Sequence, residues 1–491
     1  MPHLERESMK PSPVASKKTR LRAENAIPGE RSFETQPTAR MKTIEALEYR
    51  DAGRAIGRLA IPSALAMLGD QLLGIVDTIA IGSLGTASLA GITGATSVFL
   101  VFAIGLFAFG SGLRILGAQA IGSGRSERFG TIVRSSMLVP LGISAIIAFA
   151  LSFFARPLMQ TILPHTAAID AAAHYLALRA WCLVPMVLTG QLIVAFATAG
   201  DTKLALRVLI VINAVHIPLL GVFALGLGTH RPLGLAGAGL SSLVAEFVGL
   251  GYAIWATTKR PEFGILASWR IDRAMVNATT SLSWPEFVFL TLQILPDPIT
   301  IALLAPAGSE LIAAYRALSV INDATWAIPG SLGDACETIV GQRIGARDYA
   351  GARRFIAESR RIGLKVCLAT GALVALLAWP LAALCTLNVA LATIAALPLA
   401  VHAAITLPLK GYAMTMLAPI RAAGNTRWVM LMGIATTTIA TSGIAIAILV
   451  LHAGLWAVPL GWTIGWLFRD AATTLHLRSG DWERRRITLA S

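Results

Sequence analysis

The sequence Ala-Gln-Ala-Ile-Gly at residues 118–122 returns later in the chain as Gly-Gln-Arg-Ile-Gly at residues 341–345. The turn Ala-Gly-Asp-Thr-Lys at residues 199–203 returns as Ala-Gly-Asn-Thr-Arg at residues 423–427, at the same offset of 223 or 224 residues. Both copies lie among long apolar segments, so the repeated unit is a bundle of membrane helices. This organisation predicts a transporter that is built from two similar lobes.

The composition places the chain in a membrane. Of its 491 residues, 55% are hydrophobic and 14% are charged, which is too apolar for an ordinary soluble protein. A helix needs about 20 mostly apolar residues to cross a hydrocarbon core about 30 Å thick. We predict twelve such stretches, centred near residues 68, 104, 142, 186, 216, 246, 292, 325, 367, 406, 440 and 464. The fold class is therefore an all-α membrane protein, with twelve transmembrane helices in two pseudo-symmetric six-helix lobes.

The distribution of positive charge along the chain is typical of a membrane protein rather than of a nucleic-acid-binding protein. The net charge is +14, but most of the 41 Lys and Arg residues lie in the two tails and in alternate loops. This positive-inside pattern predicts that both termini are cytoplasmic, with anionic membrane lipid as a sufficient partner. The four cysteines are isolated in apolar surroundings and form no CxxC pair, so neither zinc nor a disulfide is expected: Cys182, Cys336, Cys367 and Cys385.

The same patterns divide the chain. We predict a polar, disordered cytoplasmic tail at residues 1–54, an N-lobe of spans one to six at 55–257 and a cytoplasmic linker at 258–279. A C-lobe of spans seven to twelve at 280–475 and a basic cytoplasmic tail at 476–491 complete the chain. The tail contains no apolar signal-peptide core, so the first span itself must direct insertion. Because each lobe has an even number of spans, an axis along the membrane normal relates the two.

Motifs for ATP hydrolysis or peptide and ester cleavage do not occur. There is no Gly-Lys dipeptide for a phosphate-binding loop, no HExxH and no GxSxG. We therefore expect no enzyme and no cofactor, and uphill transport must draw on an ion gradient.

Carboxylates within the spans are the first candidates for that coupling. Asp70 and Asp77 lie seven residues apart in the first span, hence on one helical face. An acid near the bilayer centre costs about 2.5–3.5 kcal/mol, so it normally faces the bundle interior or water. Such an acid can bind and release a proton near neutral pH. The alternative is a structural acid that is hydrogen-bonded to its neighbours.

Polar residues of spans five and six are placed to serve such an acid. Asn213 and His216 lie in span five, and Ser241 and Ser242 begin span six. All four can hydrogen-bond a carboxylate of span one, although His216 also fits a satisfied core histidine.

The second lobe lacks the acid pair. At the repeat offset Asp70 becomes Gln293 and Asp77 becomes Thr300. Asp297 lies between Pro296 and Pro298, which break span seven and free backbone carbonyls near an acid. That arrangement fits either a cation site or a simple kink.

Three charged residues within spans suggest further roles. Arg114 corresponds to Glu337 at the repeat offset, so the two face each other across the pseudo-axis and are candidates for a cytoplasmic gate ion pair. The alternatives are snorkelling of Arg114 and local pairing of Glu337 with Arg343. Lys410 lies deep in span ten with no obvious local partner, and either attracts an anionic substrate or tethers an acid.

These residues together resemble the multidrug and toxic compound extrusion (MATE) family across about residues 55 to 475. The resemblance rests on Pro62, Gly-Ile-Val-Asp-Thr at 74–78, Gly-Ser-Leu-Gly at 82–85 with Leu89 and Ala90, Gln119 with Ile121 and Gly122, and Ala-Gly-Asp at 199–201. It is repeated in the second half, where Pro62 returns as Pro285 and Gly85 as Gly308.

The resemblance implies a two-lobe antiporter that exports amphipathic organic compounds in exchange for protons or sodium, by alternating access. Its first-helix coupling acid would be Asp77, and its span-five asparagine would be Asn213. We expect Asn213 and Ser242 to adjust the affinity of Asp77, with Asp70 as the second acid. The chain departs from the family at Ile217 and Gln293, where some members carry acids, and in span ten, where an acid is missing. These departures make a sodium site in the second lobe doubtful and favour the DinF-like and plant-like branch, with proton coupling in the first lobe. Lys410 and Arg316 leave room for organic anions.

The expected protein is a monomer in a bacterial inner membrane that handles small organic substrates and H+ or Na+. The alternative function is a lipid-linked or polysaccharide-precursor flippase of the same superfamily, which would need a larger cationic cavity and usually more spans.

Overall fold

The computed structural model describes residues 52–84, 86–162, 169–228, 231–268, 270–386 and 388–484. Within these ranges it describes the side chains except those at 70–79, 82, 86, 87, 89, 90, 305 and 309. The N-terminal tail up to residue 51 and the last seven residues of the basic tail therefore lie outside the described residues, as do the side chains of Asp70 and Asp77.

The regular secondary structure of the described residues consists of helices, without strands. The first half contains α3 (Ala52–Gly82), α4 (Thr86–Phe107), α5 (Gly110–Gly122), α6 (Phe129–Ile162), α7 (Ile169–Ala180), α8 (Leu183–Thr198), α9 (Lys203–Phe223) and α10 (Leu235–Thr258). The second half contains α11 (Arg273–Leu292), α12 (Pro296–Leu304), α13 (Ser309–Thr325), α14 (Ala327–Gly345), α15 (Tyr349–Leu376), α16 (Ala378–Thr386), α17 (Val389–Ala422), α18 (Thr426–Leu449), α19 (Ala457–Arg478) and the short α20 (Asp481–Arg484). Short 3-10 turns at Ser126–Arg128, Pro261–Phe263, Ala305–Ala307 and Gly454–Trp456 join some of them.

Length and apolar composition qualify eight helical stretches of the described chain as membrane spans, or nine if α15 and α16, bent by 65°, are one span. This confirms an all-helical, multi-pass membrane protein. Each of the twelve predicted span centres lies within a helix. The exact number of twelve spans stays a prediction.

The helix boundaries follow the sequence repeat. The helix α5 ends at Gly122 and α14 at Gly345, while α9 begins at Lys203 and α18 at Thr426, so both pairs are 223 residues apart. The turns before α9 and α18 also match, because each contains a glycine with positive φ, 92° at Gly200 and 78° at Gly424. Glycine adopts this conformation without the steric penalty of a side chain.

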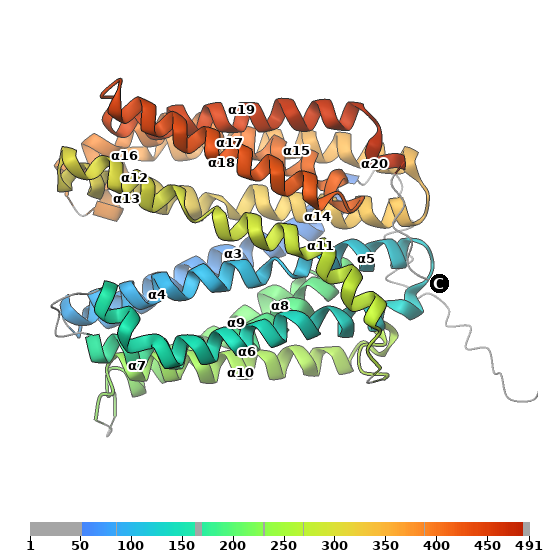
Figure 1. The fold of residues 1–491 in the computed structure, drawn as a ribbon, viewed down its shortest axis with the longest axis horizontal. Coiled ribbons are helices and arrows are strands. Elements are labelled where there is room, and N and C mark those ends of the chain that lie inside the picture. Colours follow the sequence, from blue (N-terminus) through green and yellow to red (C-terminus); the bar gives the residue numbers. More distant parts are fainter. Residues whose placement is uncertain are drawn as a thin grey trace, which may run out of the picture. The chain divides into compact units, whose positions relative to one another are not determined.

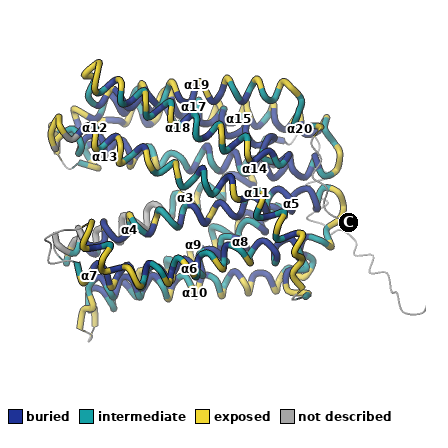
Figure 2. Tube along the Cα trace, in the orientation of Figure 1, coloured by how far each residue is buried: buried dark blue, intermediate teal, exposed yellow. Residues whose placement is uncertain are grey.

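Figure 1 shows the helices α4–α10 gathered on one side and α13–α19 on the other, with α11 crossing between the two groups. We call the groups the N-lobe and the C-lobe. The helix α3 contacts both, since it packs along α9 and its first turns pack against α14. Ile56 and Leu59 of α3 are buried there with Leu332 and Ile339 of α14. Figure 2 shows a zone of buried residues, in dark blue, where α14 and α5 meet. The assignment of residues to lobes, linker and tails remains a prediction.

The connection between the lobes is fixed to the N-lobe. Arg134 of α6 donates to the carbonyl oxygens of Gly264 at 2.6 Å and of Ile265 at 3.0 Å. Asp272 caps α11 by accepting from the amide of Ala274 at 2.8 Å, so this helix begins at Arg273, inside the predicted linker.

The two lobes are joined where α5 lies against α14. Gln119 donates through Nε2 to the carbonyl oxygen of Ala422 at 2.7 Å, and Gln342 donates through Nε2 to the carbonyl oxygen of Thr198 at 2.8 Å. Each bond crosses between lobes, and each acceptor is the last residue of a helix, whose carbonyl has no partner within that helix. We call this reciprocal pair of bonds the clasp.

Two glycines allow the close approach that the clasp requires. A Cβ atom on Gly122 would overlap the carbonyl oxygen of Gln342, and one on Gly345 would overlap the carbonyl oxygen of Gln119. These glycines occupy equivalent positions of the two copies, so the sequence stretch that defines the repeat also forms the contact between the lobes.

We predict that Gly122→Ala lowers the apparent melting temperature of the detergent-purified protein. The added methyl group must push α5 and α14 apart, an overpacking that costs about 1–3 kcal/mol. Gly142→Ala is the matched control, because Gly142 lies within α6 and a Cβ there meets nothing within 4 Å. The control should keep or slightly raise the melting temperature. Equal melting temperatures for the two variants would contradict the clasp geometry.

Candidate functional site

The proposed coupling acids lie on α3, alongside α9. Thr202 donates to the carbonyl oxygen of Arg58 at 3.3 Å, and farther along Gly69 lies against the side chain of Leu209. Residue numbers rise together along both helices, so α3 and α9 run in the same direction. Asp77 lies about two turns beyond Gly69 on the backbone of α3, at the depth of residues 213–217 on α9.

The polar residues predicted to surround Asp77 form hydrogen bonds mainly within their own helices. Asn213 is half-buried and donates to the carbonyl oxygen of Leu209 at 2.9 Å. Ser242 is buried and donates to the carbonyl oxygen of Ala238 at 3.0 Å. Ser241 Oγ lies 3.4 Å from Nδ1 of the buried His216, which links α10 to α9. The acceptor oxygens of Asn213 and Ser242 are thus oriented by local hydrogen bonds. Their role at Asp77 stays a prediction.

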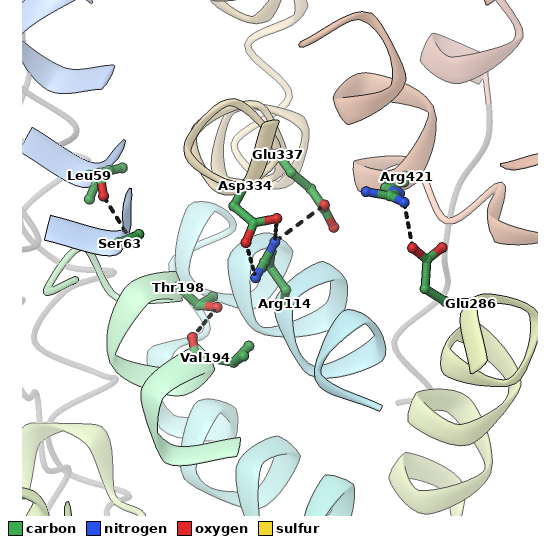
Figure 3. Close-up of polar contacts among 9 residues, drawn as sticks. All are labelled: Leu59, Ser63, Arg114, Val194, Thr198, Glu286, Asp334, Glu337 and Arg421. Carbon is green, nitrogen blue, oxygen red and sulfur yellow. Dashed lines mark hydrogen bonds and ion pairs between the residues drawn. The ribbon is translucent and has the colours of Figure 1, made fainter. Parts of the chain in front are cut away.

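A group of charged side chains, largely buried except for the half-exposed Asp334, lies between the lobes, close to the clasp (Figure 3). Arg114 of α5 donates through Nη2 to Asp334 at 2.9 Å, and its Nη1 lies 3.6 Å from Glu337 Oε2. Arg421 of α17 donates to Glu286 of α11 at 2.5 Å. We call these five residues the inter-lobe charge cluster. Only 3% of Glu337 is exposed, and Glu286 is also buried.

The cluster contains the predicted contact of Arg114 with Glu337, but also an acid that the sequence reasoning overlooked. Asp334 lies one helical turn before Glu337 on α14 and is the closer partner of Arg114. The spacing of three residues was the available signal, since it places both acids on one helical face. Arg343 pairs instead with Asp348 at 2.9 Å. Whether the Arg114 contact serves as a gate stays a prediction.

The pair of Glu286 and Arg421 has no counterpart in the N-lobe. At the repeat offset Glu286 corresponds to Ser63, which donates to the carbonyl oxygen of Leu59 of its own helix at 3.2 Å (Figure 3). Arg421 corresponds to Ala197, because the helix ends Ala422 and Thr198 are equivalent. The sequence reasoning missed Arg421 because it lies at the end of a span, where basic residues normally face the cytoplasm.

In the C-lobe, Asp297 is held by two hydroxyl groups of α13. Tyr315 donates to its Oδ1 at 2.6 Å and Ser319 to its Oδ2 at 3.1 Å. The chain breaks nearby, since α11 ends at Leu292, Gln293 caps it and α12 begins at Pro296. Within the described ranges no three His, Cys, Asp or Glu side chains are grouped so that they could hold a metal ion.

Lys410 has partners that are far away in the sequence. It is 3% exposed, and its Nζ lies 2.5 Å from Asn322 Oδ1 of α13. The ring centres of Trp326 and Trp466 lie 5.7 Å and 6.0 Å from the ammonium group. The same amide oxygen lies 3.1 Å from His402 Nε2.

Two repeated, helical lobes around buried charges define a membrane transporter of the two-lobe type. A family model described as MatE matches residues 62–221 and 287–448, one match in each half of the chain. These segments make up more than half of the 491 residues, so the chain belongs to the MatE family.

Named relatives and solved structures agree with this assignment. The "Probable multidrug resistance protein NorM" of Synechocystis sp. is 27% identical over 66% of this chain and 70% of its own length. The "Multidrug resistance protein NorM" of Photobacterium profundum is 24% identical over 62% of this chain and 68% of its own length. A structure described as the outward-facing conformation of a multidrug resistance MATE family transporter shares the fold with a TM-score of 0.82, at 19% identity, over 91% of this chain and 100% of that one. A MATE crystal structure in complex with MaD3S gives the same TM-score, identity and coverage.

These findings confirm the predicted family and fold class, and with them a multi-pass protein of a multidrug efflux family. The DinF-like and plant-like assignment stays a prediction.

We predict that Arg421→Gln lowers the melting temperature strongly, because it leaves Glu286 buried without its partner. Breaking a buried pair on one side costs about 3–5 kcal/mol. The double variant Arg421→Gln/Glu286→Gln should recover most of the loss, because two neutral amides replace the pair. Melting curves of both single variants and the double variant check this. A double variant less stable than either single would show that the two residues do not act as a pair.

Proposed function

We propose that the protein is a secondary active antiporter, which exports amphipathic organic compounds in exchange for protons or sodium. The observation that carries this proposal is the reciprocal clasp. Two equivalent lobes that contact each other through equivalent residues can separate there and close elsewhere without rebuilding either lobe. Membership of a multidrug efflux family supports the class of substrate.

In this proposal Asp77 is the coupling acid. It lies on the helix that packs along α9 in the N-lobe and against α14 of the C-lobe, so a change in its charge acts on both. Protonation removes a charge from the lobe and permits α3 to bend at its glycines, which releases substrate outward. Asn213 and Ser242 adjust the affinity of Asp77, and Asp70 is the second acid.

The clasp and the inter-lobe charge cluster close the cytoplasmic side. The loop after α5 contains Arg125 and Arg128, and such basic loops face the cytoplasm. With this orientation the described state is open toward the outside, and both termini are cytoplasmic. We further propose that the protein acts as a monomer in a bacterial inner membrane.

We predict that Asp77→Asn abolishes exchange in proteoliposomes. An inwardly directed proton gradient should drive export of a cationic dye such as ethidium by the unaltered protein. The variant should export no more dye than liposomes without protein, because an asparagine at this position cannot bind and release a proton. Asp170→Asn is the control, because Asp170 is exposed on α7 and pairs with Arg156 at 3.0 Å, away from the clasp. Undiminished exchange by Asp77→Asn would sink the assignment of the coupling acid.

The gate is tested by charge reversal. In an Asp334→Asn background, which leaves Glu337 as the acid facing Arg114, either Arg114→Glu or Glu337→Arg should impair dye transport. Combining them should restore much of it, since close buried charges couple by about 1.5–7 kcal/mol. If the combined variant transported no better than either single reversal, the gate pairing would be wrong.

A further inference from the structure

Helix α13 has two polar faces that lead to different places. Tyr315, Ser319 and Asn322 follow each other at helical spacing and point into the C-lobe, toward Asp297, His402 and Lys410. Arg316 and Asp323 are exposed on another face. Charged side chains at this depth avoid lipid, so that face borders water. In Figure 1, α13 lies on the side of the C-lobe that is turned toward the N-lobe.

Asn322 connects the two faces. Its Oδ1 accepts from Lys410 Nζ, and its Nδ2 donates to Asp323 Oδ1 at 3.3 Å. A buried ammonium group is therefore joined through one amide to an exposed carboxylate. The amide oxygen Oδ1 carries no hydrogen, so His402 Nε2 must donate to it. Neutral His402 therefore carries its proton on Nε2.

The surroundings of Lys410 stabilise its charge weakly. The contacts to Asn322 and to the tryptophan rings are those of a neutral amide and of π faces. None of the described carboxylates lies within 4 Å of Nζ. The titratable or charged groups that act on it are His402 of α17, Asp323 of α13 and Cys367 of α15. Beyond these lie Asp297 and Arg316 next to Asp323, Asp334 and Glu337 on α14, and Arg469 and Asp470 on α19 after Trp466.

We propose that Asp323, Asn322 and Lys410 form a second coupling site, in which an organic cation at Asp323 and a proton on Lys410 exclude each other. The proposal rests on the proposed function and deepens it, because it assigns the C-lobe substrate site to cations. A cation that binds Asp323 brings positive charge close to the ammonium group in a medium of low dielectric, where like charges repel strongly. One N–H bond of Lys410 then breaks with its electron pair left on Nζ, and the proton passes to water. The neutral amine keeps its hydrogen bond to Asn322.

The proposal fixes the direction in which the affinity for the cation changes with pH. Because binding releases a proton from this site, affinity for the cation rises with pH, by up to about tenfold per pH unit where exchange is complete. Lys410→Met removes the competing charge, so the cation binds more tightly and with little dependence on pH. Lys410→Arg keeps a charge that cannot leave, so the cation binds more weakly, again with little dependence on pH.

The test measures the Kd of tetraphenylphosphonium by quenching of tryptophan fluorescence over a series of pH values from about 7.5 to about 10, a range in which the Asp323 carboxylate stays ionised and adds no slope of its own. Full-length protein in detergent is used, in an Asp77→Asn background that removes the N-lobe contribution. Lys365→Met is the matched control, since Lys365 is an exposed lysine of α15, and it should keep the unaltered Kd and pH slope.

Opposite shifts in Kd for Lys410→Met and Lys410→Arg, with the pH slope lost in both, support the proposal. Shifts in the same direction, or a pH slope that survives both substitutions, overturn it. If a Lys410 variant fails to fold, Asp323→Asn provides the test instead, because the side chain of Asp323 is exposed. It should weaken binding and lose the pH slope, and a retained slope also overturns the proposal. Since the readout is equilibrium binding, its failure is distinct from failure of proton-driven exchange in proteoliposomes.

Discussion

The contact between the two lobes depends on the carbonyl groups at two helix ends, which need hydrogen-bond donors from outside their own helices. The last carbonyl groups of α8 and α17 have no partner within their helices, and an apolar environment makes unpaired carbonyls costly. Each finds its donor in a glutamine of the other lobe, Gln342 for Thr198 and Gln119 for Ala422. Neither lobe satisfies both its own helix end and its own glutamine without the other. Separating the lobes therefore breaks two equivalent bonds together, which favours two discrete states over a continuous series.

The helices of the two lobes are equivalent, but their polar and charged side chains differ. Among the described side chains, the ion pair of Glu286 with Arg421 of α17 and the network around Lys410 have no equivalent in the N-lobe. At the positions that correspond to His402 and Asn322, the N-lobe has Arg179 stacked over Phe99, with 4.7 Å between the guanidinium carbon and the ring centre. Such differences give two similar lobes different responses to a proton or a substrate. An antiporter needs this property, because one cargo must bias the equilibrium in one direction and the other cargo must reverse it.

The repeat and the apolar segments predicted the fold well, because both depend on features that extend over tens of residues. Breaks within spans were harder to predict. Hydropathy does not change where α4 ends at Phe107 and α5 begins at Gly110, although the backbone switches to tighter hydrogen bonds there. Contacts between distant helices were largely out of reach. The pairing of Arg114 with Glu337 was predicted because the repeat brings the two together, whereas Asn322 as the partner of Lys410 follows only from how α13 packs against α17.

A reversible cross-link across the clasp tests most directly whether the lobes part at this contact. Ala118 Cβ lies 2.9 Å from the position that a Cβ on Gly341 would take, so a cysteine at each position can form a disulfide after a small shift. The pair Ala118→Cys/Gly341→Cys is made in a chain whose four native cysteines are replaced, and dye transport in proteoliposomes is measured before and after reduction. We predict that the oxidised protein is cross-linked and inactive, and that reduction restores transport. Full transport by the cross-linked protein would show that the lobes do not need to part at this contact.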